Sequence, residues 1–247
     1  MHSLELFEST MDLEQTAIFN NIIREVTESM DHTLDFHNAS HVIKVYKATV
    51  EILSSMNFLT DNEKHVLSFI ALMHDICHPG ITNTQHALWN TNIHKSYGHN
   101  SSNEQMHADM ACMLFRKYNI LNAFPCSIEE KTIRSIILST DIVEHFNVMK
   151  NIEKSATREN LYMTIIKCAD IFHITNDFKE CIYWGENINK EMGTIMNIEH
   201  EIRFIQKMGK PLFERLYEMY PCEQFEKYIN AIQQNVTLYE QMRSVAF

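Results

Sequence analysis

Glycine and proline are too scarce in this sequence for a fold built from tight turns. The 247 residues include five glycines and four prolines, although the average usage of the two together is about 12%. Folds made of short strands need many turns, and most turn types require one of these residues. The sequence therefore predicts an all-α protein. Because it contains no repeat, low-complexity tract or linker, we expect residues 1–247 to form a single compact multi-helix domain.

Apolar residues recur at helical spacing through most of the chain. The pattern Ser-x-x-Glu at Ser101 and again at Ser127 matches the capping box that begins many helices. The run His78-Pro79-Gly80 is typical of a helix end. Together these signals predict helices near residues 62–76, 102–118, 128–140, 157–173, 177–192, 198–219 and 223–242.

The charge balance limits the partners of the protein. It has 21 Lys and Arg against 32 Asp and Glu, a net charge of −11, which repels nucleic acids and anionic membranes. Six cysteines occur without a C-x-x-C pair, as is typical of reduced thiols. We expect no signal peptide in the acidic first 30 residues, and no apolar run reaches the length that spans a membrane. We expect a soluble cytoplasmic protein with no nucleic-acid or membrane partner, and the oligomeric state stays open.

Histidines and acids occur at positions where a buried charge would need compensation. His37 and His41 are four residues apart, which is one face of a helix. His74-Asp75 closes an apolar helix, and Asp170 is the one acid in another apolar stretch. A divalent metal would offset the cost of burying these charges. The alternative is that they are capped or solvent-exposed groups at helix ends.

The residue types suit a dinuclear metal centre. One metal would take His41, His74, Asp75 and Asp170, and Asp75 would bridge to a second metal completed by waters. Such a pair makes a bridging water acidic and clamps a phosphate group for attack. The chemistry that follows is hydrolysis of a phosphoester.

The motifs also carry a family resemblance. The sequence contains His37-Asn38-x-x-His41, His74-Asp75-x-x-His78-Pro79-Gly80-x-x-Asn83, Thr140-Asp141 and Lys167-Cys168-Ala169-Asp170. In this combination the chain resembles the catalytic domain of class I 3′,5′-cyclic nucleotide phosphodiesterases over about residues 30–240. The resemblance implies an all-helical fold of the HD type. It also implies hydrolysis of cAMP, cGMP or both to the 5′-monophosphate by a metal-bridging hydroxide, with zinc at the first metal site and magnesium or manganese at the second.

The resemblance assigns roles to single residues. It makes His41, His74, Asp75 and Asp170 the metal ligands, and His37 the general acid that protonates the leaving 3′ oxygen. It makes Glu104 the hydrogen-bonding support of His37, although the capping box at Ser101 competes for the same side chain. Three further residues would stand behind the ligands and hold bound waters: His78, Thr140 and His107.

The resemblance also outlines a substrate pocket, which would contain Phe36, Tyr97, His173, Trp184, Ile188, Glu201 and Phe204. Phe204 stands where the family stacks a phenylalanine on the base, and Glu201 stands where it grips the purine with a glutamine. An ionised glutamate only accepts hydrogen bonds, which favours the N–H donors of guanine or another substrate. The alternative is that Glu201 lies on a solvated helix face in the acidic run of residues 199–201.

Departures from the family pattern leave other functions open. Only 12 residues separate Ile188 from Glu201, so we expect an open pocket that binds substrate more weakly or tolerates bulkier cyclic nucleotides. Phe36 stands where the family often has tyrosine, and His173 where it has asparagine. One alternative is a phosphohydrolase of the wider His-Asp superfamily that acts on other nucleotides. Another is a catalytically inactive module that binds a cyclic nucleotide.

Overall fold

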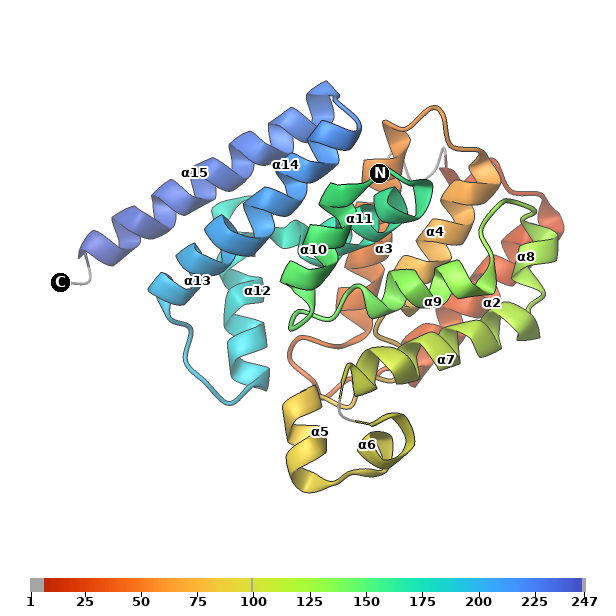
Figure 1. Ribbon diagram of the computed structural model, residues 1–247, viewed down its shortest axis with the longest axis horizontal. Coiled ribbons are helices and arrows are strands. Elements are labelled where there is room, and N and C mark those ends of the chain that lie inside the picture. The colour runs from red at the N-terminus through yellow and green to blue at the C-terminus, as the bar shows by residue number, and fades with distance from the viewer. Residues whose placement is uncertain (1–6, 99, 246–247) are drawn as a thin grey trace.

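The N-terminal half of the chain forms a packed group of helices around α4. The computed structural model describes residues 7–98 and 100–245. In this half the longer helices are α2 (Leu13–Ser29), α3 (Ala39–Ser54), α4 (Asp61–Met73), α7 (Ser102–Lys117) and α9 (Glu130–Leu138). Every residue of α4 from Val66 to Met73 is buried, and the helix packs against α3, α7, α9 and α11, which spans Arg158–Asp170 (Figure 1). Such all-round burial makes α4 the rigid support for the residues that follow its C-terminus.

Short helices connect these longer ones. They are α5 (Asn83–Trp89), α6 (Asn92–Tyr97), α8 (Ile120–Ala123) and α10 (His145–Lys154). Helices α5 and α6 form a small projection below the body in Figure 1. The turn that leads from α4 toward α5 contains Gly80 at φ +70°, where a Cβ atom would lie 2.3 Å from Leu34 Cδ2. Glycine is therefore required at the end of the His78-Pro79-Gly80 run.

The C-terminal half contains α11 (Arg158–Asp170), the 3-10 helix η1 (Phe172–Thr175), α12 (Phe178–Glu191), α13 (Ile198–Phe204), the π-helix η2 (Ile205–Gly209), α14 (Lys210–Met219) and α15 (Glu223–Val245). The helix predicted over 198–219 is thus interrupted by the π-helical segment η2. A Cβ atom at Gly209 would lie 2.4 Å from Ile174 Cδ1, so glycine lets this turn approach η1 closely. Helices α14 and α15 lie side by side at the edge of the molecule (Figure 1).

Two predicted capping boxes are wrong, although helices begin near both. Ser101 has φ 51° and its hydroxyl donates to Asp141 Oδ2 at 2.6 Å, away from its own helix. The hydroxyl of Ser127 donates to Glu63 Oε1 at 3.3 Å, and α9 begins only at Glu130. Both serine hydroxyls donate to buried carboxylates of other segments, and this stronger bond to a charged acceptor orients each side chain away from the amides of its own helix. Capping boxes form instead at Asp12, Thr60 and Thr82.

The described residues form one all-α domain without strands, and the predicted fold class is confirmed. All six cysteines are free thiols. Among the described helices, no segment combines the length and the apolar character that crossing a lipid bilayer would require.

Candidate active site

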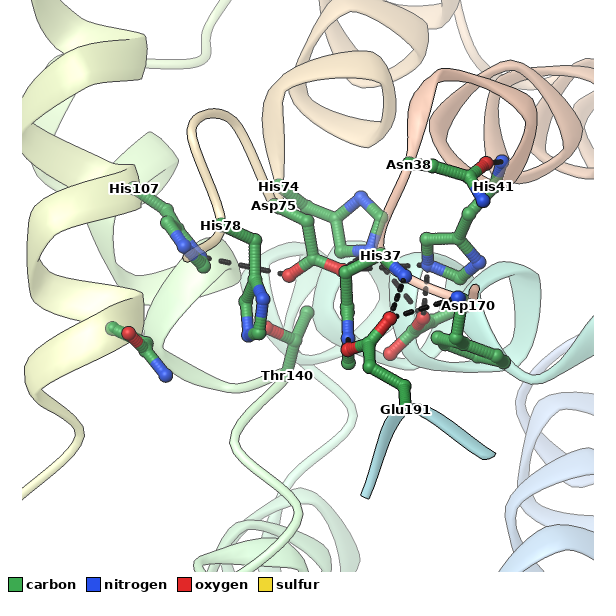
Figure 2. A network of polar contacts seen from close by, with 12 residues as sticks. His37, Asn38, His41, His74, Asp75, His78, His107, Thr140, Asp170 and Glu191 are labelled. Carbon is green, nitrogen blue, oxygen red and sulfur yellow. Dashed lines mark hydrogen bonds and ion pairs between the residues drawn. The ribbon is translucent and has the colours of Figure 1, made fainter. Parts of the chain in front are cut away.

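Four residues from three helices meet at one point. His41 lies on α3, His74 and Asp75 directly follow α4, and Asp170 is the last residue of α11. One ligand atom from each lies within 4.8 Å of the others (Figure 2). The Nε2 atom of His41 is 3.4 Å from Asp75 Oδ2 and 3.3 Å from Asp170 Oδ1. The Nε2 atom of His74 is 3.2 Å and 3.3 Å from the same two oxygens. The structure thus brings together the four predicted metal ligands.

Hydrogen bonding fixes which nitrogen of His74 is available to a metal. Its Nδ1 lies 2.7 Å from the carbonyl oxygen of Ala71, which can only accept, so Nδ1 carries the proton. Its Nε2 is buried and has no hydrogen-bond partner, and the same holds for Nε2 of His41. The Nε2 atoms of both imidazoles therefore face two carboxylates. A divalent cation between them could be coordinated by all four ligand atoms, two nitrogens and two oxygens, so the residues present fit a metal ion.

The electrostatics of this cluster show the same need for a cation. Burial would raise the pKa of Asp75, but the neighbouring histidines outweigh it and hold that pKa well below its usual range. Burial would lower the pKa of His74, but Asp75 and Asp170 raise it well above its usual value. Without a metal the carboxylates draw protons onto the imidazoles, because opposite charges at this distance stabilise each other. A bound cation would replace those protons.

Glu191, at the end of α12, holds His37. Its Oε2 accepts hydrogen bonds from the backbone amides of Phe36, at 2.8 Å, and His37, at 2.9 Å. Its Oε1 lies 2.5 Å from His37 Nδ1, and the other ring nitrogen, Nε2, lies 3.9 Å from Asp75 Oδ2 (Figure 2). The support that the sequence analysis assigned to Glu104 is therefore made by Glu191. The sequence contained a signal for Glu191. It lies one helical turn after Ile188, a predicted pocket residue, and therefore shares a helix face with it.

Glu104 has a different partner. Its Oε2 accepts a hydrogen bond from Asn83 Nδ2 at 2.9 Å, and the side-chain oxygen of Asn83 in turn accepts from the amide of Asn103 at 2.8 Å. Burial, together with the charge of Asp141, raises the pKa of Glu104 to about 7. Glu104 is thus a half-buried carboxyl group near the metal cluster, held by Asn83 at the end of the HPG-x-x-N motif.

His78 stacks on His37, with ring centroids 3.8 Å apart and an interplanar angle of 18°. The amide of Gly80 donates to His78 Nδ1 at 3.1 Å, so the proton of the neutral ring is on Nε2. His37, His78 and Glu191 also lie within 4.8 Å of one another. They do not make a good cation site, because the remaining nitrogen of His78 carries a proton. The stacking instead holds the ring of His37 from one side.

The other two residues predicted behind the ligands lie close to them. His107 Nδ1 is 3.5 Å from Asp75 Oδ1, and both of its ring nitrogens are buried without a hydrogen-bond partner. Thr140 lies below His78 in Figure 2, and its hydroxyl donates to the carbonyl of Ile137 at 2.8 Å. Each side chain can thus support a group bound at the metal cluster.

The predicted pocket residues divide between two cavities that both reach Asp170. Trp184 and His173 line a cavity of about 160 Å³ together with His41 and Asp170. Phe36 packs edge-on against Trp184, with ring centroids 5.5 Å apart. Phe204 lines a small cavity of about 10 Å³ that also contains Thr140 and Lys167. In this structure the pocket residues do not form one continuous wall.

Glu201 packs against α12, not into solvent. It is half-buried, and its Oε1 accepts a hydrogen bond from Asn189 Nδ2 at 3.3 Å. A Cβ atom at Gly185 would lie 3.2 Å from Glu201 Oε2, so glycine there makes room for the carboxyl group. Burial raises the pKa of Glu201. The fully solvated face weighed in the sequence analysis is therefore wrong.

Ile188 and Tyr97 differ in their relation to the cluster. Ile188 is half-buried on α12, between Trp184 and Glu191. The hydroxyl of Tyr97 donates to Asp109 Oδ2 at 3.0 Å, and the other oxygen of Asp109 pairs with Arg134 of α9. Tyr97 therefore forms its hydrogen bond outside the site, on α7, because α6 packs against that helix.

Comparison with known proteins agrees with this arrangement. The profile of the 3′5′-cyclic nucleotide phosphodiesterases matches residues 36–202, well over half of the chain. The chain belongs to the 3′5′-cyclic nucleotide phosphodiesterase family. Its matched region begins at Phe36 and extends past Glu201, so it includes all four metal-type ligands and both His37 and Glu191.

Several phosphodiesterases resemble this family member along much of its length. It is 24% identical to the cGMP-specific 3′,5′-cyclic phosphodiesterase alpha of Plasmodium falciparum, over 94% of this chain and 28% of the relative. It is 30% identical to the dual specificity calcium/calmodulin-dependent 3′,5′-cyclic nucleotide phosphodiesterase 1 of Drosophila melanogaster, over 56% of this chain and 18% of the relative. This chain therefore spans less than a third of the length of either relative.

A solved structure shares the fold of this phosphodiesterase family member. The phosphodiesterase domain of the RhoPDE fusion protein from the choanoflagellate Salpingoeca rosetta superposes with a TM-score of 0.81 at 20% identity. The match covers 99% of this chain and 88% of that domain. The likeness establishes the all-α architecture.

Proposed function

We propose that this protein hydrolyses a 3′,5′-cyclic nucleotide to the 5′-monophosphate. The observation that carries the proposal is the meeting of two unpartnered imidazole nitrogens and two carboxylates beside His37, whose Nε2 lies 3.9 Å from the nearer carboxylate. A site of this kind places a proton donor next to a cation-binding cluster, as phosphodiester hydrolysis requires. We also propose that residues 1–247 form a single catalytic domain, consistent with the fold match over 99% of the chain.

His41, His74, Asp75 and Asp170 would hold the metal. When bound, divalent cations would activate water and neutralise the charge of the cyclic phosphate. Asp75 would contribute to holding both cations, a role supported by its two oxygens facing different sides, Oδ2 toward His41 and His74 and Oδ1 toward His107. Zinc at the first site and magnesium or manganese at the second remain our proposal, because mixed nitrogen and oxygen donors suit zinc and sites rich in oxygen suit magnesium.

His37 would donate the proton that the reaction needs. Water adds its oxygen to phosphorus while the bond from phosphorus to the 3′ oxygen breaks, and the leaving alkoxide is a strong base that must be protonated. Glu191 holds Nδ1 of His37, so Nε2 is the nitrogen that faces the cluster. Glu191 thus acts as a positioning residue, and His78 supports the same ring by stacking. His107 and Thr140 would hold groups bound at the cluster, and Glu104 would accept or donate a proton there.

Glu201 would recognise the base of the cyclic nucleotide by hydrogen bonding, with Phe204 and Ile188 on either side of the purine ring. The relatives include proteins named for cGMP, for cAMP and for both, so family membership does not select a base. An ionised Glu201 would accept from the N1–H and N2–H groups of guanine, which favours cGMP. The raised pKa of Glu201 makes its neutral form easier to reach, and a neutral carboxyl can also donate a hydrogen bond to adenine.

The short connection after α12 would leave the pocket open. It runs over residues 192–197, and Ile195 is 92% exposed. We therefore propose that bulkier cyclic nucleotides are tolerated. Trp184 and His173 border the larger cavity beside Asp170, which offers space on that side of the cluster.

The test is an assay of the purified, Mn²⁺- or Mg²⁺-supplemented protein with cAMP, cGMP and a cyclic dinucleotide. We expect the 5′-monophosphate from cAMP or cGMP, identified by ³¹P NMR, and no turnover by Asp170→Ala. Asp109→Asn is the matched control, because Asp109 is an acid on α7 that pairs with Arg134 outside the cluster. Release of inorganic phosphate instead would indicate a different phosphohydrolase. Inactivity of the wild type on all three substrates would overturn the proposal.

A further inference from the structure

A buried lysine stands next to the metal cluster without being used by the proposed reaction. Lys167 is 4% exposed and lies on α11, three residues before Asp170 and therefore one helical turn from it. Its Nζ atom donates to the carbonyl oxygen of Ser139 at 2.5 Å. Ser139 directly follows α9 and is itself buried, so the lysine joins the end of α9 to the helix that supplies a metal ligand.

The surroundings of Lys167 are rich in carboxylates. Lys167, Thr140 and Asp170 line the same small cavity. Asp141, which is 3% exposed, lies two residues after Ser139. Burial lowers the pKa of Lys167 to about 8, whereas Asp170, Asp141 and Glu104 each favour its charged form. Two further titratable groups act on or respond to its charge, Cys168 and His145. One ammonium group thus lies near three carboxylates, in addition to the two histidines that contact Asp170.

Burying several carboxylates together is costly unless positive charge lies among them. A donor to a backbone carbonyl need not be charged, since an amide or a hydroxyl would serve the same carbonyl. A full positive charge at this position therefore indicates a second task beyond joining two segments. That task is needed most when no divalent cation is bound, because the two protonated imidazoles of His41 and His74 then bring less positive charge to the cluster than two divalent cations would.

We propose that Lys167 is a resident counter-cation of the metal site, a positioning residue that keeps the Asp170 helix and the Ser139–Asp141 segment together before a divalent cation binds. The inference rests on the metal centre of the proposed function, but not on the substrate or the reaction. Removing the charge should lower the thermal stability of the metal-free protein, and an added divalent cation should restore most of the lost stability.

The experiment compares the melting temperature of chelator-treated protein with and without Mn²⁺. We expect Mn²⁺ to raise the Tm of Lys167→Met by about 3–5 °C more than it raises that of the wild type. Lys167→Arg keeps the charge and should respond like the wild type. Lys167→Gln keeps a donor for Ser139 without the charge, and should respond like Lys167→Met. Thr164→Val, a buried change on the same helix that removes a bond to the carbonyl of Asn160 and a longer one to Met219 Sδ, is the matched control and should respond like the wild type.

Hydrogen exchange of residues 139–143 gives a second measurement. Without metal, their amides should exchange faster in Lys167→Met than in Thr164→Val, and Mn²⁺ should remove the difference. An equal Mn²⁺ response in Lys167→Met and the wild type would overturn the inference, and so would a wild-type response of Lys167→Gln. If Lys167→Met folds only with Mn²⁺, as followed by circular dichroism, the inference is supported; if it is unfolded in both conditions, the inference is wrong. If Mn²⁺ changes the Tm of neither the wild type nor any variant, both this inference and the proposed metal centre are wrong. If the protein only fails to hydrolyse cyclic nucleotides, the proposed reaction is wrong and this inference is unaffected.

Discussion

The Nδ1 atom of His37 lies 2.5 Å from Oε1 of Glu191, although the two are 154 positions apart in the chain. The second oxygen of the same carboxylate accepts from the amides of Phe36 and His37. One side chain of α12 therefore fixes both the ring of His37 and the backbone that carries it. This double attachment turns Nε2 of His37 toward Asp75, and several expected outcomes depend on it.

Replacing His37 with asparagine should lower kcat for a cyclic nucleotide by roughly 100- to 10,000-fold, the usual contribution of a general acid. The 3′ alkoxide cannot leave readily without a proton. A phosphodiester with a p-nitrophenolate leaving group needs no such proton, so its hydrolysis should fall far less. Steady-state rates on both substrates measure the ratio. Equal losses on the two substrates would show that His37 is not the proton donor.

Glu191→Gln should lower kcat by about 10- to 100-fold, the usual effect of losing a group that orients an active-site histidine. The amide has one oxygen where the carboxylate has two, so it cannot accept from both the ring and the two backbone amides. The ¹H NMR resonance of the His37 Nδ1 proton, which lies between His37 and Glu191, should disappear from its wild-type position. Glu186→Gln, on the exposed face of the same helix, is the control. If the resonance survives in Glu191→Gln but is lost in Glu104→Gln, the sequence-based assignment of Glu104 would be restored.

Divalent cations should stabilise the protein through the four-residue cluster. At about 100 times the dissociation constant, binding contributes about 2.7 kcal/mol, which corresponds to an increase in Tm of about 5–10 °C for a chain of this size. Asp170→Asn should abolish most of this increase and lower the bound metal measured by mass spectrometry. Asp109→Asn should keep both. An unchanged metal content in Asp170→Asn would remove Asp170 from the ligand set.

Glu201→Gln should raise kcat/KM for cAMP relative to cGMP by about tenfold, because an amide can both donate and accept whereas an ionised carboxylate only accepts. The difference should be smaller at pH 5.5 than at pH 8. Burial raises the pKa of Glu201, so the wild-type group gains a proton more readily at the lower pH and then resembles the amide. A preference that does not change with the substitution at either pH would exclude Glu201 from base recognition.

His65 should make the protein sensitive to acid. Burial lowers its pKa to about 4, and its ring packs against Phe7 and Phe124 at centroid distances of 4.3 and 5.4 Å. In the unfolded chain the pKa is near 6.5, so below that pH the unfolded state binds the additional proton. Stability from this group is therefore present above about pH 6.5, falls as the pH decreases toward 4, and changes no further below 4.

Urea unfolding in chelator at pH 7 and pH 5 measures this loss. The free energy of unfolding of the wild type should fall by about 1–2 kcal/mol more between these values than that of His65→Phe, which has no titrating ring. The comparison cancels the contribution of the other titrating groups, because both proteins contain them. Equal pH dependence of the two proteins would contradict the assignment.

Much of this protein could be predicted from short stretches of its sequence. The helices α4, α11, α12 and α15 lie within a few residues of their expected ranges, because helical periodicity repeats every few residues and needs no distant partner. The ligand types at His41, His74, Asp75 and Asp170 were also readable, since buried charges in apolar helices are rare unless compensated.

Only the tertiary structure determined which side chains form hydrogen bonds with one another. Ser101 left its expected cap for Asp141, Glu104 paired with Asn83, and His37 paired with Glu191. Each of these bonds joins segments whose relative rotation depends on how whole helices pack, and rotating a helix by one residue, about 100°, turns a different side chain toward the site. Local sequence determines which residues share a face of a helix, whereas only the packed domain determines which face meets which.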